Sequence, residues 1–235
     1  MAFIKQVEPP TLYQRGGLNS IAVKFDLQEY RQELFEEFNI DFPESLQNAV
    51  NKRKAEFLAG RYAAKLALEQ VGITGFTVNI GENRQPLWPS DIRGSITHTN
   101  DLACCVVTKK EHCSALGLDT ENLLNEKTAN DIAKNIVTEK ERLVLERYST
   151  IFSESCTLAF SAKESLFKAL YDEVGQYFDF LDAEITDLCS TTNKMTLTLL
   201  KDLSPSIKKD MSYHCFYETL EGKAHTLTIE KHLNL

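Results

Sequence analysis

Segments of helical and of strand character alternate along the whole chain, and this alternation limits the fold more than any other feature of the sequence. Apolar residues recur with helical spacing over about 27–38, 45–71, 127–147 and 156–173. Strand-like runs occupy 75–80, 101–108, 113–119, 195–200, 212–219 and 223–230. Because both kinds of segment occur in both halves of the chain, we expect a mixed fold of the α/β (α+β) class.

Composition narrows the class of protein. The hydrophobic fraction of 43% and the charged fraction of 26% are ordinary for a soluble globular protein. No apolar run approaches the length of a membrane span, and the N-terminal stretch lacks the pattern of a secretory signal. The six cysteines show no C-x-x-C motif and no regular spacing, which favours free thiols in a reducing compartment. We therefore expect a cytoplasmic protein without a membrane span.

The charge distribution indicates a small anionic ligand. A net charge of −8 argues against non-specific binding of nucleic acid. The segment 51–65, "NKRKAEFLAGRYAAK", is nevertheless strongly basic, and a helix would place Arg53 and Arg61 on one side of it. Such a run is usually a solvated helix face. Arginine is also well suited to bind a terminal phosphate, so both interpretations remain open.

A pair of acids closes the strand-like run "LGLDTE". The two-residue period of a strand places Asp119 and Glu121 on one face and Thr120 on the other. Two adjacent carboxylates repel each other unless a positive charge lies between them, and Mg²⁺ is the ion that this arrangement favours. The alternative is a strand that ends in solvent.

A third acid lies in the helical segment 160–170, "FSAKESLFKAL". Lys163 falls inside its apolar stripe, Glu164 lies on the edge of that stripe, and Lys168 follows one turn later. A surface Glu–Lys pair is the simpler explanation. If the edge of the stripe faces a site, Glu164 becomes a third metal ligand and the two lysines become phosphate donors.

A further phosphate-binding candidate precedes the strand-like run at 101–108. In "RGSITHTN", Thr97 and His98 could donate hydrogen bonds to a phosphate, although a lone histidine is more often structural. The chain has no G-x-S-x-G motif, no P-loop and no G-x-G-x-x-G. Two segments, from Phe57 and from Phe160, share the pattern F-x-A-x5-K, which is a weak hint of a duplicated unit.

Together, these motifs resemble those of one enzyme family. "GLDTE" (117–121) followed by "FSAKESLFK" (160–168) is similar to the signature of the 4′-phosphopantetheinyl transferases. "RQPLWP" (84–89) and "GSITH" (94–98) resemble motifs of the larger, Sfp- and EntD-type members. "RKAEFLAGRYAA" (53–64) resembles the N-terminal helix of the EntD type, which is associated with siderophore synthesis.

The resemblance implies an enzyme that uses coenzyme A and Mg²⁺. It would transfer the 4′-phosphopantetheine arm to a serine of an apo peptidyl, aryl or acyl carrier domain and release adenosine 3′,5′-bisphosphate. Enterobactin-like siderophore or other nonribosomal peptide synthesis is the expected pathway. It further implies two pseudo-twofold-related α/β halves, 1–112 and 113–235, with the ligand in the cleft between them. A monomer is expected.

The resemblance also assigns roles to individual residues. Asp119, Glu121 and Glu164 would hold the Mg²⁺ ion, and Lys163 and Lys168 would bind phosphates, with Lys168 and Glu164 at the reacting pyrophosphate. The contacts to the nucleotide end of coenzyme A would come from Arg53, Arg61, Arg84, Thr97 and His98. Glu141 matches the position of a proposed general base for the serine proton.

Three alternatives to this function remain open at this stage. The first is a Mg²⁺-dependent hydrolase of coenzyme A or a related nucleotide pyrophosphate. The second keeps the same transfer reaction but directs it to fatty-acid or polyketide carriers. The third is a non-catalytic module that binds coenzyme A or a carrier, although a binder does not need all three acids.

Overall fold

The computed structural model describes residues 3–149 and 151–231, which fall into two compact units, Met1–Glu111 and His112–Leu235. Both units combine helices with antiparallel sheets, so the expected mixed fold class is confirmed. Short 3-10 helices occur at Thr11–Gly17, Leu27–Glu29, Glu44–Leu46, Lys110–His112 and Phe180–Asp182. Within the described ranges, no helix is long and apolar enough to cross a membrane.

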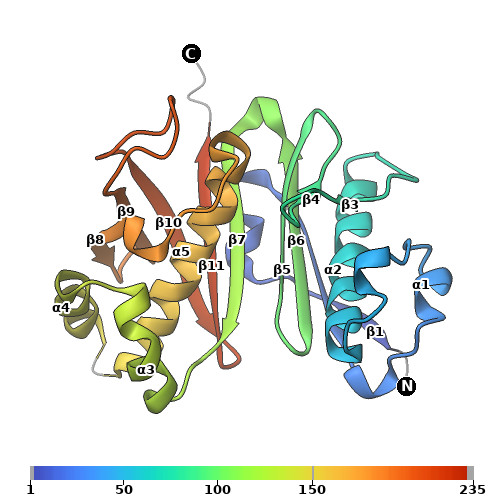
Figure 1. Ribbon diagram of the computed structural model, residues 1–235, viewed down its shortest axis with the longest axis horizontal. Coiled ribbons are helices and arrows are strands. Elements are labelled where there is room, and N and C mark those ends of the chain that lie inside the picture. Colours follow the sequence, from blue (N-terminus) through green and yellow to red (C-terminus); the bar gives the residue numbers. More distant parts are fainter. Residues whose placement is uncertain (1–2, 150, 232–235) are drawn as a thin grey trace. The chain divides into compact units, whose positions relative to one another are not determined.

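The first unit packs one long helix against a four-stranded sheet (Figure 1). Its strands are β1 (Ile4–Val7), β2 (Asn19–Phe25), β5 (Ile92–His98) and β6 (Leu102–Lys109), in the order β1-β2-β6-β5. Its helices are α1 (Leu34–Glu37) and α2 (Asn51–Gln70), and β3 (Asn79–Ile80) pairs with β4 (Pro86–Leu87). Small residues bring α2 close to the sheet, because a Cβ atom on Gly60 would lie 3.1 Å from Cγ2 of Ile96.

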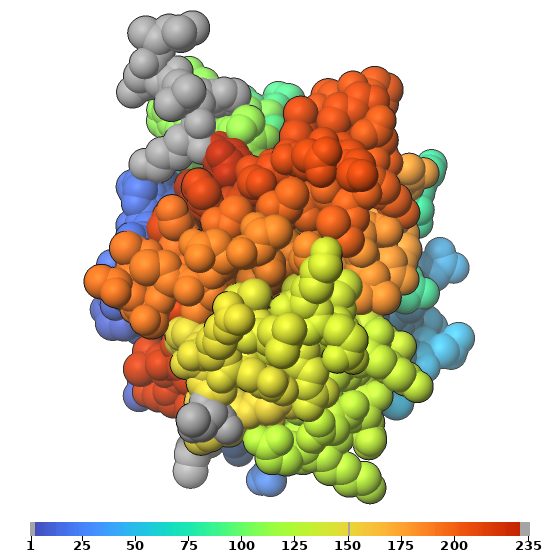
Figure 2. Space-filling model, turned by 90° about the vertical axis from the view of Figure 1, so that its left-hand side faces the viewer, coloured from blue at the N-terminus to red at the C-terminus, as the bar shows by residue number. Residues whose placement is uncertain are grey.

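The second unit packs helix α5 (Phe152–Val174) against a five-stranded antiparallel sheet. Its strands are β7 (Cys113–Asn122), β8 (Ala183–Cys189), β9 (Lys194–Leu199), β10 (Ser212–Leu220) and β11 (Lys223–Lys231), in the order β7-β11-β10-β9-β8. Helices α3 (Glu126–Ile136) and α4 (Glu139–Tyr148) complete it. Figure 2 shows these two helices in yellow-green beside the orange segments that follow α5.

Helix α5 approaches β7 unusually closely because of Gly117. A Cβ atom at this position would lie 2.0 Å from the carbonyl oxygen of Ser165, so only glycine fits. The helix ends at Gly175, whose φ of 68° forms a left-handed C-cap. Close packing here brings charged groups of β7 and α5 within reach of each other.

The two units share an order of elements. In the first, β2 is followed by α2 and later by β5 and β6, with β6 paired to β2 and β5 paired to β6. In the second, β7 is followed by α5 and later by β10 and β11, with β11 paired to β7 and β10 paired to β11. The two F-x-A-x5-K segments lie in α2 and α5, at corresponding places of the two units.

Some expected elements have different bounds. The periodic stretch 127–147 forms two helices, because Thr138 begins a new one with a capping box. The stretch 27–38 contains only a 3-10 turn and the short α1. Strands β1, β2 and β8 were not predicted, since polar residues interrupt their apolar pattern, as in "NSIAVKF" and "AEITDLC".

Candidate active site

Strand β7 presents Asp119 and Glu121 toward α5. Asp119 is 3% exposed, and its Oδ2 accepts a hydrogen bond of 2.8 Å from Oγ of Ser161 on α5. Thr120 points to the opposite face, where its Oγ1 lies 3.0 Å from Nδ1 of His225. The strand alternation therefore directs both acids to the helix that carries Glu164.

Lys168 of α5 contacts the same cluster. Its Nζ lies 2.7 Å from Oδ1 of Asp119 and donates a second hydrogen bond of 3.2 Å to the carbonyl of Leu118. Glu164, one turn earlier on the same helix, is half-buried. Strand β7 and helix α5 thus bring together four of the residues predicted from the sequence.

The two glutamates of this cluster, Glu121 and Glu164, hold their protons more tightly than usual. Burial, together with the neighbouring Asp119 and Glu164, raises the pKa of Glu121 to about 7, although Lys168 opposes the shift. Burial likewise raises the pKa of Glu164, and here too Lys168 opposes the shift. The cluster has three carboxyl groups and one lysine, so it carries an excess of negative charge when the acids are ionised. A bound cation would neutralise this excess.

The chemistry of these side chains fits a hard divalent cation, since Mg²⁺ favours carboxylate oxygens. In their present arrangement, however, no three His, Cys, Asp or Glu side chains within 3–149 and 151–231 are placed to hold a metal ion. The two oxygens of Asp119 contact Ser161 and Lys168. A metal ion would compete with these contacts for the carboxylate.

Lys163 and Glu141 lie away from this cluster, in the interior of the second unit. Their side chains are 2% and 0% exposed, and Nζ of Lys163 lies 2.7 Å from Oε1 of Glu141. Lys163 also donates to the carbonyl of Ile136, and Glu141 accepts from the backbone N–H groups of Thr138 and Ile185. This placement argues against Lys163 as a phosphate ligand and against Glu141 as a general base, since their charged atoms are already satisfied.

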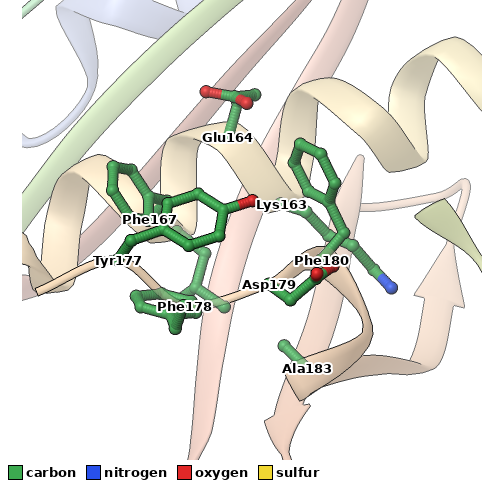
Figure 3. Close-up of a pocket in the computed structure, with 9 residues that line it drawn as sticks. Lys163, Glu164, Phe167, Tyr177, Phe178, Asp179, Phe180 and Ala183 are labelled. Atoms are coloured by element: carbon green, nitrogen blue, oxygen red, sulfur yellow. The ribbon is translucent and has the colours of Figure 1, made fainter. Parts of the chain in front are cut away.

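A small aromatic pocket adjoins Glu164. It has a volume of about 60 Å³, and its lining includes Phe167, Tyr177, Phe178 and Phe180 (Figure 3). The ring of Phe167 lies 5.6 Å from that of Tyr177 and 5.2 Å from that of Phe178. Tyr177, Phe178 and Phe180 were not predicted as site residues, although the aromatic run "YFDF" at 177–180 was a signal for them.

In the first unit, Arg53 and His98 meet at one end of α2. Nη1 of Arg53 lies 3.0 Å from Nε2 of His98, and Nδ1 of His98 lies 3.9 Å from Oε2 of Glu56. Thr97 is buried, and strand alternation turns its side chain to the face opposite that of His98. The two residues of the T-H dipeptide therefore cannot present their side chains to the same group.

Arg61 lies further along α2, beside a cavity of about 580 Å³ formed with residues 39–45 and 75–80. Its guanidinium carbon is 4.6 Å from the centre of the Phe57 ring, and its Nε has no hydrogen-bond partner among the described residues. Burial lowers its pKa to about 10. Arg84 is exposed in the turn before β4, with a φ of 67°, and does not line this cavity.

Two family matches divide the chain in the same way as the two units. Residues 42–108 match the 4′-phosphopantetheinyl transferase N-terminal domain, and residues 115–228 match the 4′-phosphopantetheinyl transferase superfamily. The acid cluster and Lys168 lie in the second match, and Arg53, Arg61, Arg84 and His98 lie in the first.

Individual relatives agree with these matches. Enterobactin synthase component D of Salmonella typhimurium is 37% identical over 72% of this chain and 69% of its own length. The protein of the same name from Salmonella typhi is 42% identical over 62% of this chain and 60% of its own length. The 4′-phosphopantetheinyl transferase PptT of Mycobacterium tuberculosis is 28% identical over 60% of this chain and 61% of its own length.

The chain spans less than two thirds of the length of two of these three relatives. The similarity to the Salmonella typhimurium protein extends over more than two thirds of both sequences, and the two family matches cover the residues of both candidate sites. The chain therefore belongs to the 4′-phosphopantetheinyl transferase superfamily.

Proposed function

We propose that this protein transfers the 4′-phosphopantetheine arm of coenzyme A to a serine of an apo carrier domain. The serine oxygen forms a bond to the phosphorus on the pantetheine side of the pyrophosphate, and the bond to the bridging oxygen breaks. Adenosine 3′,5′-bisphosphate leaves and the hydroxyl proton is released. The observation that carries the proposal is the cluster of Asp119, Glu121, Glu164 and Lys168.

Asp119, Glu121 and Glu164 are the residues that would hold a Mg²⁺ ion. Their shortage of positive charge and the raised pKa values of both glutamates support this assignment. When bound, such an ion would neutralise charge on the pyrophosphate and orient it. Lys168, released from Asp119, would donate to the same pyrophosphate, while Glu141 and Lys163 hold each other in the interior.

The nucleotide end of coenzyme A would bind to the basic residues of the first unit. Arg53 and His98 form one polar corner, which suits a terminal phosphate. Arg61 offers a guanidinium with an unsatisfied Nε beside a cavity large enough for a small ligand. Arg84 is exposed and free to turn toward the same nucleotide.

The aromatic pocket beside Glu164 would receive the apolar part of the pantetheine arm. The gem-dimethyl group is the apolar part of that arm closest to the phosphate. The cavity of about 60 Å³ offers it Phe167, Phe178 and Phe180, beside the charged residues Lys163 and Asp179. This position next to Glu164 would place the reacting phosphorus beside the acid cluster.

The carrier class, the cellular compartment and the oligomeric state are also proposals. Relatives named enterobactin synthase component D support carrier domains of siderophore or other nonribosomal peptide synthesis as the partners. Free cysteines at all six positions support a reducing compartment such as the cytoplasm. We further propose that the chain acts as a monomer.

The proposed transfer reaction is tested by measuring release of adenosine 3′,5′-bisphosphate with and without an apo carrier domain, in Mg²⁺ and in EDTA. A transferase releases the bisphosphate only when carrier and Mg²⁺ are both present. Equal release without carrier would indicate a hydrolase, and binding of coenzyme A without any release would indicate a binding module. Equal release in EDTA would overturn the assignment of the three acids to Mg²⁺.

A further inference from the structure

A buried carboxylate lies within the most basic helix of the chain. Glu56 of α2 is 9% exposed, and its Oε2 lies 3.9 Å from Nδ1 of His98 on β5. Its other oxygen lies 3.8 Å from Nζ of Lys52 on the preceding turn. A carboxylate at this place is unexpected, because it repels the phosphate that Arg53 and His98 would bind.

The contact between Arg53 and His98 fixes the proton on the imidazole. Nη1 of Arg53 lies 3.0 Å from Nε2 of His98, and a guanidinium has only donors. Nε2 of His98 therefore accepts this bond and carries no proton. The proton of the neutral ring is on Nδ1, the nitrogen that faces Glu56.

A bound phosphate monoester requires a different protonation state of the His98 ring. Its oxygens accept hydrogen bonds, so Arg53 turns toward them and Nε2 of His98 can contact them only after it gains a proton. That proton comes from solvent and makes the ring an imidazolium. The carboxylate of Glu56, on the far side of the ring, stabilises this charged form and keeps the ring oriented.

We propose that Glu56 is a positioning residue for His98 and that binding of the 3′-phosphate of coenzyme A is coupled to uptake of one proton at Nε2 of His98. The inference rests on the proposed function, because it takes the 3′-phosphate as the ligand of His98. It explains why a carboxylate is buried in a phosphate-binding helix.

Two cations near the ring act against protonation. Lys52 and Arg53 of α2 are positive and disfavour an imidazolium, and burial raises the pKa of Glu56 itself. Asp101, in the turn after β5, accepts a hydrogen bond from Thr99, and the β6 residue opposite His98 is Ala103. Glu56 is a carboxylate placed 3.9 Å from Nδ1 of His98, where it can offset these cations.

Calorimetric titration tests the coupling. Coenzyme A is titrated into the full chain at about pH 7.5, where a phosphate monoester is mostly dianionic, in buffers with different heats of ionisation. Wild type should take up close to one proton with coenzyme A. Dephospho-coenzyme A, which lacks the 3′-phosphate, should bind with almost none.

Glu56→Gln keeps the size and hydrogen-bonding capacity of the side chain but removes its charge. Loss of this charge should weaken coenzyme A about tenfold and abolish most of the proton uptake. Glu56→Asp should restore part of the uptake. Glu69→Gln, an exposed glutamate of the same helix, should behave as wild type. Transfer by Glu56→Gln should show a raised KM for coenzyme A and a nearly unchanged kcat.

Two outcomes would overturn the inference and leave the proposed function intact: undiminished proton uptake in Glu56→Gln, or equal uptake with dephospho-coenzyme A in wild type. If wild type binds neither ligand, the proposed function fails and the inference fails with it. Circular dichroism of each variant confirms that it is folded before titration.

Discussion

At the scale of single residues, the acid cluster depends on side-chain contacts that the sequence motifs do not show. Ser161 holds one oxygen of Asp119, Lys168 holds the other, and Lys163 is directed away from the cluster by Glu141. Spacing along a helix predicts which residues share a face. It cannot show that Lys163 finds a buried partner from α4, because that pairing depends on tertiary packing. For this reason the sequence identified the acids of the cluster but placed Lys163 and Glu141 in roles that their burial opposes.

Two neighbouring hydroxyls of α5 offer a matched comparison. Ser161 and Ser165 both bond threonines of β11, but only Ser161 also contacts Asp119. We expect alanine at either position to cost about 1–2 kcal/mol in the free energy of unfolding by urea. Only Ser161→Ala should raise the Mg²⁺ concentration for half-maximal transfer, by about tenfold, because partners that orient a ligand tune metal affinity. Equal Mg²⁺ dependence in the two variants would contradict the role of Ser161.

The buried pair of Lys163 and Glu141 should behave as a structural contact. Removing either charge alone leaves the other buried without compensation, and we expect Lys163→Met or Glu141→Gln to lower the free energy of unfolding by about 3–5 kcal/mol. The double variant should lose less than the sum of the two. Urea unfolding measures these energies. If Glu141→Gln abolished transfer with no loss of stability, a direct role in proton transfer would be favoured instead.

Glu121 should make the metal-free protein less stable as the pH rises. Its pKa of about 7 in the folded protein lies above the ordinary 4.5, so between these values the folded state binds more protons than the unfolded chain. Its contribution to stability is complete below 4.5 and is lost as the pH rises through 7. In EDTA, the thermal midpoint of wild type minus that of Glu121→Gln should therefore decrease as the pH is raised from about 4 to 8. A relative midpoint that rises over this range would contradict the assigned shift.

At the scale of elements, the site depends on how closely α5 lies on β7. The helices at 45–71 and 156–173 could be predicted because their apolar faces are long and periodic, and they correspond to α2 and α5. The break at Thr138 was less visible, because the capping box "TEKE" interrupts an apolar pattern that continues on both sides. The close approach at Gly117 could not be predicted, since it depends on the position of the Ser165 carbonyl in three dimensions.

Substitution of this glycine tests the importance of the contact. A methyl group at position 117 would meet backbone atoms of α5 at 2.0 and 2.6 Å, so the helix must move away from the strand. We expect Gly117→Ala to cost about 1–3 kcal/mol of unfolding free energy and to reduce transfer, because Asp119 and Lys168 lie on the separated elements. Gly60→Ala in α2 meets only a side-chain atom of Ile96 at 3.1 Å and should be much milder. Urea unfolding and transfer rates of the two variants make the comparison, and equal losses would contradict it.

At the scale of the whole molecule, the chemistry is divided between two units built on the same order of strand, long helix and paired strands. The first carries the basic residues of α2 with His98, and the second carries the acids of β7 and α5. This division would allow a protein with a net charge of −8 to bind the proposed anionic co-substrate. The weak F-x-A-x5-K repeat was the trace of this common order that we found in the sequence.

The most direct test of the proposed transfer is the intact mass of an apo carrier domain after incubation with this protein, coenzyme A and Mg²⁺. Wild type should add one phosphopantetheine to the carrier, and a carrier whose acceptor serine is alanine should stay unmodified. Asp119→Ala and Glu164→Ala should leave the apo carrier unmodified as well, while Glu69→Gln should act as wild type. An unchanged carrier mass with the wild-type protein, or full modification by Asp119→Ala, would contradict the account.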